Sequence, residues 1–187
     1  ALLSSSAAAS GELSNAVAAY HVRSERALEQ SGIPATFLRP NSFMSNALRW
    51  LPQIESGTPI REPFSDVPIA TNDPRDIAAV GAVGLLADEP ETRAYRITGP
   101  EPLRAAERVA ILSEVLGREL PFEPLSNEEA RQQMSASMPD AYVDAFFDFF
   151  VEGSLDETTV LPTVGAVTGR PPRTFREWAQ EHAGEFG

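Results

Sequence analysis

The sequence contains no lysine and no cysteine, and only two of its 187 residues are histidines. Without lysine, the chain offers no P-loop lysine, no Schiff-base amine and no lysine general base. Without cysteine, it forms no disulfide, no thiolate zinc site and no cysteine nucleophile. The histidines, His21 and His182, stand far apart and fit no metal-ligand spacing, so we expect no metal site.

Positive charge is scarce as well. The 15 basic residues are all arginines spread along the chain, and 27 acidic residues leave a net charge of -12. Such a surface repels phosphate backbones, so we expect no nucleic-acid partner. No apolar run approaches the roughly 20 residues that a membrane-spanning helix needs. The initial ALLSSSAAAS does not resemble a signal peptide. We therefore expect no membrane partner, and the absence of cysteine favours a cytoplasmic location.

What remains is an ordinary globular composition, 42% apolar and 22% charged. Short apolar runs alternate with helical patterns, which predicts an α/β fold with a parallel sheet and a mostly helical last third. The predicted strands are residues 2–3, 33–38, 67–71, 93–98 and 120–125. The predicted helices are residues 15–31, 42–51, 73–87, 103–116, a segment from 126, residues 140–151 and a segment from 174.

Capping and breaking residues delimit these elements. The Arg39-Pro40 dipeptide is expected to end a strand, and Pro52 is expected to end a helix. Gly81 and Gly84 lie within a helical pattern, which favours close helix packing over a nucleotide-binding loop. Side chains suited to helix N-caps precede several helices: Ser14 and Asn15 before the first, then Asp73, Ser126 and Thr174.

The predicted helix over residues 140–151 is rich in aromatic side chains. Phe147 projects from a different side than the main stripe, so the helix is apolar on more than one side. Core packing is the default interpretation of the stripe, and a substrate-pocket wall or a partner interface is the alternative. Asp140, Asp144 and Asp148 recur every four residues, and a solvated face explains them better than a ligand row. The stripe itself consists of Tyr142, Phe146, Phe149 and Phe150.

Polar residues follow two of the predicted strands. Ser4 to Ser6 follow the first strand, Arg39 to Phe43 follow the next, and the helix between them carries Tyr20 and His21. Ligands of open α/β sheets bind beyond the carboxyl ends of the strands. These segments therefore predict one crevice for a polar ligand, in which His21 is either a ligand-binding residue or a structural histidine.

No G-x-G-x-x-G, Walker A or G-x-S-x-G motif occurs, but several strings stand in a recognisable order. The chain resembles the carboxyl-terminal two-thirds of NmrA-like proteins, which are atypical short-chain dehydrogenase/reductases. The strings that carry the resemblance cover nearly the whole chain: LLSSS (2–6), H-x-x-x-E with A-L-x-x-S-G (21–32), TFLRPNSFMSN (36–46), PRDIAAVGA (74–82), YRITGPEPL (95–103), LGRELPFEPLS (116–126) and TGRPPRTFREWA (168–179).

The resemblance implies the carboxyl-terminal part of a Rossmann-like doubly wound parallel sheet that binds NADP or NAD, with a small, mostly helical substrate lobe. In this division, residues 1–125 form a partial NAD(P)-binding domain with interleaved lobe segments, and residues 126–187 form the lobe. Family members also carry an upstream glycine-rich pyrophosphate loop that this sequence lacks. A truncation, a separate chain or an unseen segment would each explain that absence.

Carried over residue by residue, the resemblance puts His21 where the family's Y-x-x-x-K dyad has its lysine, and Val17 where the tyrosine stands. It implies that His21 contacts the cofactor and that His21 or water supplies the catalytic proton. The other implied cofactor-binding residues are Ser4, Ser5, Arg39, Pro40, Asn41 and Phe43. The implied substrate pocket is lined by Phe43, Tyr142, Phe146 and Phe150.

Two functions follow for the protein as a whole. The first is an NAD(P)H-dependent reductase of small quinone- or enone-like molecules, and the second is a non-catalytic dinucleotide sensor that binds a protein partner. For residues 1–187 alone we expect weak NAD(P) binding or none, because they lack the phosphate loop. Exposed strand edges would favour pairing between copies, which makes a homo-oligomer a further expectation.

Overall fold

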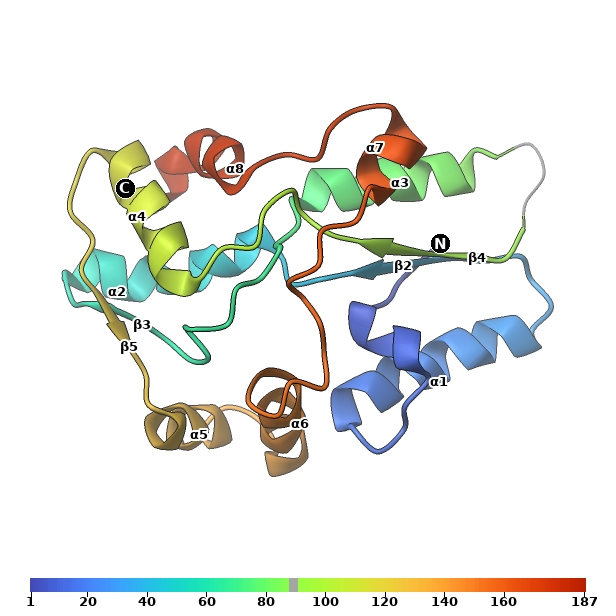
Figure 1. The fold of residues 1–187 in the computed structure, drawn as a ribbon, viewed down its shortest axis with the longest axis horizontal. Helices are drawn as coiled ribbons and strands as arrows, with labels where there is room; N and C mark the ends of the chain where they lie inside the picture. Colours follow the sequence, from blue (N-terminus) through green and yellow to red (C-terminus); the bar gives the residue numbers. More distant parts are fainter. Residues whose placement is uncertain (88–90) are drawn as a thin grey trace.

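Parallel strands and the helices that connect them organise the chain (Figure 1). The computed structural model describes residues 1–87 and 91–187. The strands are β1 (Leu2–Leu3), β2 (Thr36–Pro40), β3 (Ile60–Glu62), β4 (Arg93–Ile97) and β5 (Phe122–Pro124). The α-helices are α1 (Ala16–Gln30), α2 (Leu51–Ser56), α3 (Pro74–Leu85), α4 (Ala105–Leu116), α5 (Asn127–Ser135), α6 (Asp140–Phe150), α7 (Thr163–Thr168) and α8 (Phe175–Glu181). Short 3-10 helices are η1 (Ser6–Ser10), η2 (Met44–Trp50) and η3 (Ala183–Phe186).

The main sheet contains three parallel strands in the order β1-β2-β4. Its register pairs Leu3 with Leu38 and Pro40 with Ile97. Parallel neighbours need a crossover connection, and α1 and α3 lie within the two crossovers. In Figure 1, α1 and η1 lie on one side of the sheet, and α3 and α7 lie on the other. The predicted α/β class with a parallel sheet is therefore confirmed.

The α3 helix lies unusually close to β2. Leu38 of β2 packs with Val80 of α3 in a buried apolar cluster. A Cβ atom on Gly81 would lie 3.0 Å from Leu38 Cδ1, and one on Gly84 would lie 2.6 Å from Thr36 Oγ1. Both glycines therefore serve close helix–strand packing, as the sequence predicted.

A second core lies away from the main sheet. Here β3 and β5 form a two-stranded parallel sheet, and η2, α2, α4, α8 and η3 surround buried Trp50, Leu112, Phe175 and Trp178. The last third of the chain packs on earlier elements, since α7 contacts α3 and α8 contacts α4. No helix within residues 1–87 and 91–187 is long and apolar enough to cross a membrane.

The predicted start and end of β2 are both wrong. The strand begins at Thr36, and the Arg39-Pro40 dipeptide belongs to it. Proline lacks the N–H of a ladder hydrogen bond, which is tolerable at the last strand position. The ladder resumes immediately, because Asn41 N donates to Ile97 O at 3.0 Å.

Two further predictions are corrected in the segment after β2. The single helix expected over residues 42–51 is instead η2 followed by α2, and Pro52 lies in the first turn of α2. A missing N–H costs no intrahelical bond there. The strand expected over residues 67–71 is reduced to a bridge between Ile69 and Leu103. Neither β3 nor α7 was predicted from the sequence.

The predicted N-caps at residues 15, 73, 126 and 174 are confirmed by their hydrogen bonds. Asn15 Oδ1 accepts from the backbone N–H groups of Val17 and Ala18, both at 3.1 Å. Asp73 Oδ1 accepts from the N–H of Arg75 at 2.8 Å. Capping boxes begin at the remaining two predicted positions, Ser126 and Thr174.

Candidate functional site

The carboxyl ends of β1, β2 and β4 meet at one edge of the sheet because the strands are parallel. Just beyond β1, Ser4 N donates to Leu38 O at 2.7 Å, and just beyond β2, Asn41 N donates to Ile97 O at 3.0 Å. Strand pairing therefore positions the residues that follow both strands. Parallel α/β sheets bind ligands at this edge.

A partly buried ion pair lies on the α1 side of this edge. Leu38 faces α3, so alternation along β2 directs Arg39 toward α1. Arg39 Nε and Nη2 donate to Glu25 Oε1 and Oε2 at 2.9 and 2.5 Å. Ser4 Oγ donates to Glu25 Oε1 at 2.5 Å, and Glu25 is only 3% exposed. Ser4 and Arg39, both predicted to bind cofactor, thus use their polar groups to hold α1 on the strand ends.

Glu25 keeps its negative charge in this setting. Burial acts to raise the pKa of Glu25, but hydrogen bonds from Arg39 and Ser4 outweigh it and hold the pKa below its ordinary value. His21 lies one helical turn earlier, half-buried, with its ring edge-on to Tyr20 at a centroid distance of 5.2 Å. Burial lowers the pKa of His21, while Glu25 acts to raise it. Because the net shift is downward, the imidazole is mainly neutral at pH 7.

A second buried carboxyl joins the loops that leave β1 and β2. Ser42 N and Ser6 Oγ donate to Glu157 Oε1 at 3.0 and 3.3 Å, and Ser42 Oγ donates to Glu157 Oε2 at 2.6 Å. Burial raises the pKa of Glu157 above its ordinary value despite these hydrogen bonds. Sequence patterns did not identify Glu157, because it stands in an irregular segment far along the chain from both serines.

Two buried asparagine side chains complete the edge. Asn41 Nδ2 donates to Glu157 O at 3.0 Å, and Asn72 Nδ2 donates to Asn41 O at 3.1 Å, which fixes the orientation of both amides. The Oδ1 atoms of Asn41 and Asn72 are buried and accept no hydrogen bond from the described residues. Buried acceptors without a donor are uncommon. Neither oxygen is in contact with solvent in this structure.

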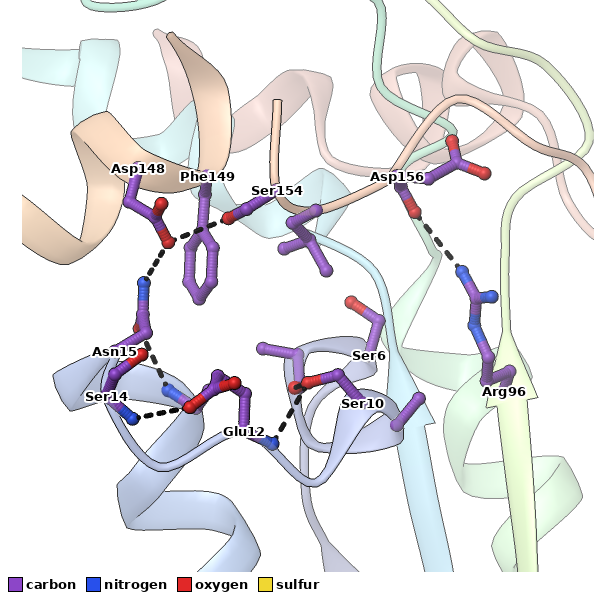
Figure 2. Close-up of a pocket in the computed structure, with 14 residues that line it drawn as sticks. Ser6, Ser10, Glu12, Ser14, Asn15, Arg96, Asp148, Phe149, Ser154 and Asp156 are labelled. Carbon is purple, nitrogen blue, oxygen red and sulfur yellow. Dashed lines mark hydrogen bonds between the residues drawn. The ribbon is translucent and has the colours of Figure 1, made fainter. Parts of the chain in front are cut away.

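A pocket of about 470 Å³ opens beside Ser6 (Figure 2). It lies between η1, the start of α1, the end of α6 and residues 154–156. Phe149 and Leu155 contribute apolar walls, and Ser10 and Ser154 add polar groups. This mixture suits a small organic molecule that carries a few polar groups.

Charged side chains on the pocket wall are mostly held by neighbours. Asp148 accepts from Asn15 Nδ2 at 2.9 Å and from Ser154 Oγ at 2.7 Å. The predicted solvated face of the helix therefore does not account for Asp148. Arg96 Nη2 donates to Asp156 O at 3.2 Å, and Figure 2 draws this contact. Among the described residues, no group of carboxylates and histidines is arranged to hold a metal ion.

The four residues predicted to line a substrate pocket do not form one surface. Phe43 packs in the apolar cluster on the α3 side of the sheet, whereas Phe146 and Phe150 pack with residues of α1 and η1. Tyr142 is exposed. The separation arises because the stripe on α6 faces α1, on the opposite side of the sheet from Phe43. Of the stripe, Phe149 is the member on the pocket wall.

The remaining predicted residues sit at the same sheet edge. Ser5 caps η1 by accepting from Ala7 N at 3.2 Å, and Pro40 is buried at the end of β2. The groups at this edge offer the nicotinamide end of a dinucleotide one acceptor, Asn41 Oδ1, and that oxygen is shielded from solvent in this structure. They do not suit its pyrophosphate, for which the sequence offers no glycine-rich loop.

Fold and site together define an α/β chain similar to the Rossmann-like NAD(P)-binding reductases. No family model matches the chain. It is 44% identical over 163 residues to the (4-alkanoyl-5-oxo-2,5-dihydrofuran-3-yl)methyl phosphate reductase of Streptomyces griseus. It is 36% identical over 165 residues to the NAD(P)H azoreductase of Xenophilus azovorans. Each alignment covers 87% of this chain and 58% of the relative, so the chain spans somewhat more than half of either protein.

Solved structures show the same fold. An NADPH-dependent quinone oxidoreductase from Escherichia coli superposes with a TM-score of 0.74 at 23% identity. The match covers 96% of this chain and 65% of that one. The same oxidoreductase has been solved in complex with NADPH.

Proposed function

We propose that these 187 residues belong to a cytoplasmic NAD(P)H-dependent reductase of the NmrA-like type that acts on small conjugated acceptors. The observation that carries the proposal is the 44% identity over 163 residues to a reductase of a dihydrofuranone phosphate. The azoreductase and the quinone oxidoreductase support the same class, since azo compounds, quinones and unsaturated lactones are all conjugated electron acceptors. The cofactor in this proposal is NADP or NAD.

The geometry of the sheet edge supports this function. In the proposal, residues 1–125 form part of the NAD(P)-binding domain with interleaved lobe segments, and residues 126–187 form a substrate lobe. Asn41 Oδ1, which is shielded from solvent in this structure, becomes the acceptor for an N–H of the nicotinamide carboxamide, and Ser5, Pro40 and Phe43 lie around the ring. Glu25, held by its ion pair, orients the helix that carries His21. The bound dinucleotide supplies a hydride, and the chain supplies the surface that orients it.

The test measures NADPH and NADH oxidation by the native protein that contains these residues. The acceptor panel holds an acyl butenolide phosphate, a benzoquinone, an azo dye and, as the matched control, a saturated ketone. We expect turnover with one or more conjugated acceptors and none with the ketone. Absence of oxidation with every conjugated acceptor would contradict the proposal.

A dinucleotide sensor is the second candidate, and one observation favours it. Val17, at the position where the family has its tyrosine, packs in the apolar cluster between α1, η1 and α6 and offers no proton. A sensor would bind NADPH in calorimetry without turnover and would associate with a protein partner, or with a second copy of itself, only when NADPH is present. Equal association with and without NADPH would exclude this version.

A further inference from the structure

Glu157 is the most buried carboxyl at the sheet edge that the proposed function leaves without a role. It is 5% exposed, and its two oxygens contact the loops after β1 and β2. A buried carboxyl without a cationic partner in hydrogen-bond contact is costly when ionised. Buried carboxyls of this kind occur most often at functional sites, where they donate or accept a proton.

One hydroxyl connects this carboxyl to the pocket. Ser6 is on the pocket wall, and its Oγ is 3.3 Å from Glu157 Oε1. Figure 2 shows the Ser6 side chain across the pocket from Phe149. A proton on Glu157 is therefore one hydroxyl away from a molecule in the pocket.

The charged groups around Glu157 leave it protonated to higher pH than an exposed glutamate. Burial is the largest influence and raises its pKa, whereas the hydrogen bonds from Ser42 and Ser6 and the charge of Arg108 on α4 act to lower it. Within its own segment, the neighbouring Asp156 accepts from the backbone of residues 158 and 159, and Arg96 of β4 donates to the Asp156 backbone. η1 and the loop after β2 present neutral hydroxyls.

We propose that Glu157 supplies, through the Ser6 hydroxyl, the proton that completes reduction of an acceptor bound in the pocket. The proposal rests on the reductase function above. Hydride addition to a conjugated acceptor leaves an anion that needs one proton. Ser6 Oγ gives its proton to this anion and takes one from Glu157 Oε1, and the Glu157 carboxylate regains a proton from solvent. Ser42 N–H and Oγ–H stabilise the carboxylate meanwhile. Glu157 is thus a positioning residue that acts through Ser6.

The test compares the pH dependence of kcat in the native protein and in Glu157→Gln, with an acceptor that the wild type reduces. In the wild type, kcat falls as rising pH deprotonates Glu157. Glutamine keeps the size of the side chain but supplies no titrating proton, so we expect kcat to drop ~100-fold and to lose this pH dependence. KM should change little. Glu157→Asp should restore part of kcat and the pH dependence.

Two serine variants separate the relay from simple packing. Ser6→Ala breaks the path and should lower kcat as Glu157→Gln does, with the double variant no worse than either single one. Ser42→Ala keeps the path but removes a hydrogen bond that lowers the Glu157 pKa, so the falling limb of kcat should move to higher pH. If Glu157→Gln does not fold, this shift in the pH profile of Ser42→Ala tests the relay, and an unchanged profile would contradict it.

The outcomes also distinguish this inference from the proposed function. If the wild type reduces a conjugated acceptor while Glu157→Gln keeps its kcat and pH profile, the relay is wrong and the reductase function stands. If the fall of kcat with rising pH disappears in His21→Gln instead, the proton comes from His21, and the relay from Glu157 through Ser6 is equally wrong. If the wild type reduces nothing, both proposals fail together.

Discussion

Two buried glutamates show how neighbouring residues decide the state of an ionisable group. Glu25 receives a two-pronged hydrogen bond from Arg39, so its charge is compensated in place. Glu157 receives only hydroxyl and backbone donors, so burial dominates its ionisation. The two groups lie at the same sheet edge and nonetheless have opposite pKa shifts.

Removing one member of the buried pair should destabilise the fold. In Arg39→Leu, Glu25 remains buried with only the Ser4 hydroxyl as donor, so we expect a loss of about 3 kcal/mol in the free energy of unfolding. Urea unfolding at pH 7 measures it. The matched control is Arg93→Leu, which removes an exposed pair with Glu91 and should cost less than about 1 kcal/mol. Equal losses in both variants would contradict this account.

The two glutamates should also give opposite pH dependences of stability. The folded pKa of Glu25 is depressed, so its contribution is present above the unfolded value near 4.5 and is lost as the pH falls. The folded pKa of Glu157 is raised, so stability falls as the pH rises above that unfolded value. The free energy of unfolding of Glu25→Gln should therefore approach that of the wild type as the pH falls. That of Glu157→Gln should rise relative to the wild type as the pH approaches neutrality. Urea unfolding between about pH 3 and pH 8 measures both pH dependences. If the difference from wild type changed with pH in the same direction for both variants, the prediction would be wrong.

The sequence anticipated residues that lie near one another along the sheet edge, and it missed those brought in from afar. Ser4, His21 and Arg39 surround Glu25 because strand, helix and strand follow one another directly. Glu157 is 151 positions from Ser6, and no local pattern encodes that contact. The assignment of Arg39 to cofactor binding likewise overlooked its partner on α1.

At the scale of elements, the sequence predicts features that depend on hydrogen bonds between neighbouring residues and misses features that depend on tertiary packing. Asn15 and Thr174 cap helices through hydrogen bonds within a few residues, so the sequence alone predicts them. β3 has three residues, too few for a periodic pattern, and it exists because it pairs with β5, which the sequence did predict as a strand within residues 120–125. The segment after β2 forms η2 because Ala47 and Trp50 are buried in the second core, which a local pattern cannot reveal.

The approach of α3 to β2 gives a prediction at the same scale. Alanine favours an α-helix over glycine by about 1 kcal/mol, but a Cβ on Gly84 would lie 2.6 Å from Thr36 Oγ1 and 2.8 Å from its Cγ2. We therefore expect Gly84→Ala to destabilise the protein by about 1–3 kcal/mol in urea unfolding. Val83→Ala, on the exposed side of α3, is the control and should stay within about 0.5 kcal/mol.

A second variant identifies the cause of that loss. Thr36→Ala removes Oγ1 and Cγ2, the two atoms closest to the new methyl group, and keeps Cβ at 3.1 Å, so the double variant Thr36→Ala/Gly84→Ala should be more stable than the sum of the single changes implies. Additive losses would mean that the helix does not approach the strand as closely as described.

On the scale of the whole molecule, charge and topology bear on how the chain meets a dinucleotide. The three-stranded sheet offers the carboxyl ends of its strands, with Asn41 Oδ1 as an unpaired acceptor. The net charge of -12 and the lack of a glycine-rich loop oppose the phosphates of the same ligand. Under the proposed function, the chain therefore offers contacts to the nicotinamide end of NAD(P)H and none to its phosphates.

This asymmetry predicts how residues 1–187 bind ligands on their own. In calorimetry, NADPH and reduced nicotinamide mononucleotide should bind with similar dissociation constants, about 1 mM or weaker, because only the nicotinamide end is held. Asn41→Leu removes the acceptor and should weaken both ligands alike, whereas Asn127→Leu, at the start of the distant α5, should change neither. Micromolar binding of NADPH, with the mononucleotide far weaker, would mean that these residues contain a phosphate site of their own. In that case the dinucleotide would lie elsewhere than at the sheet edge, since none of the groups described there can hold a pyrophosphate.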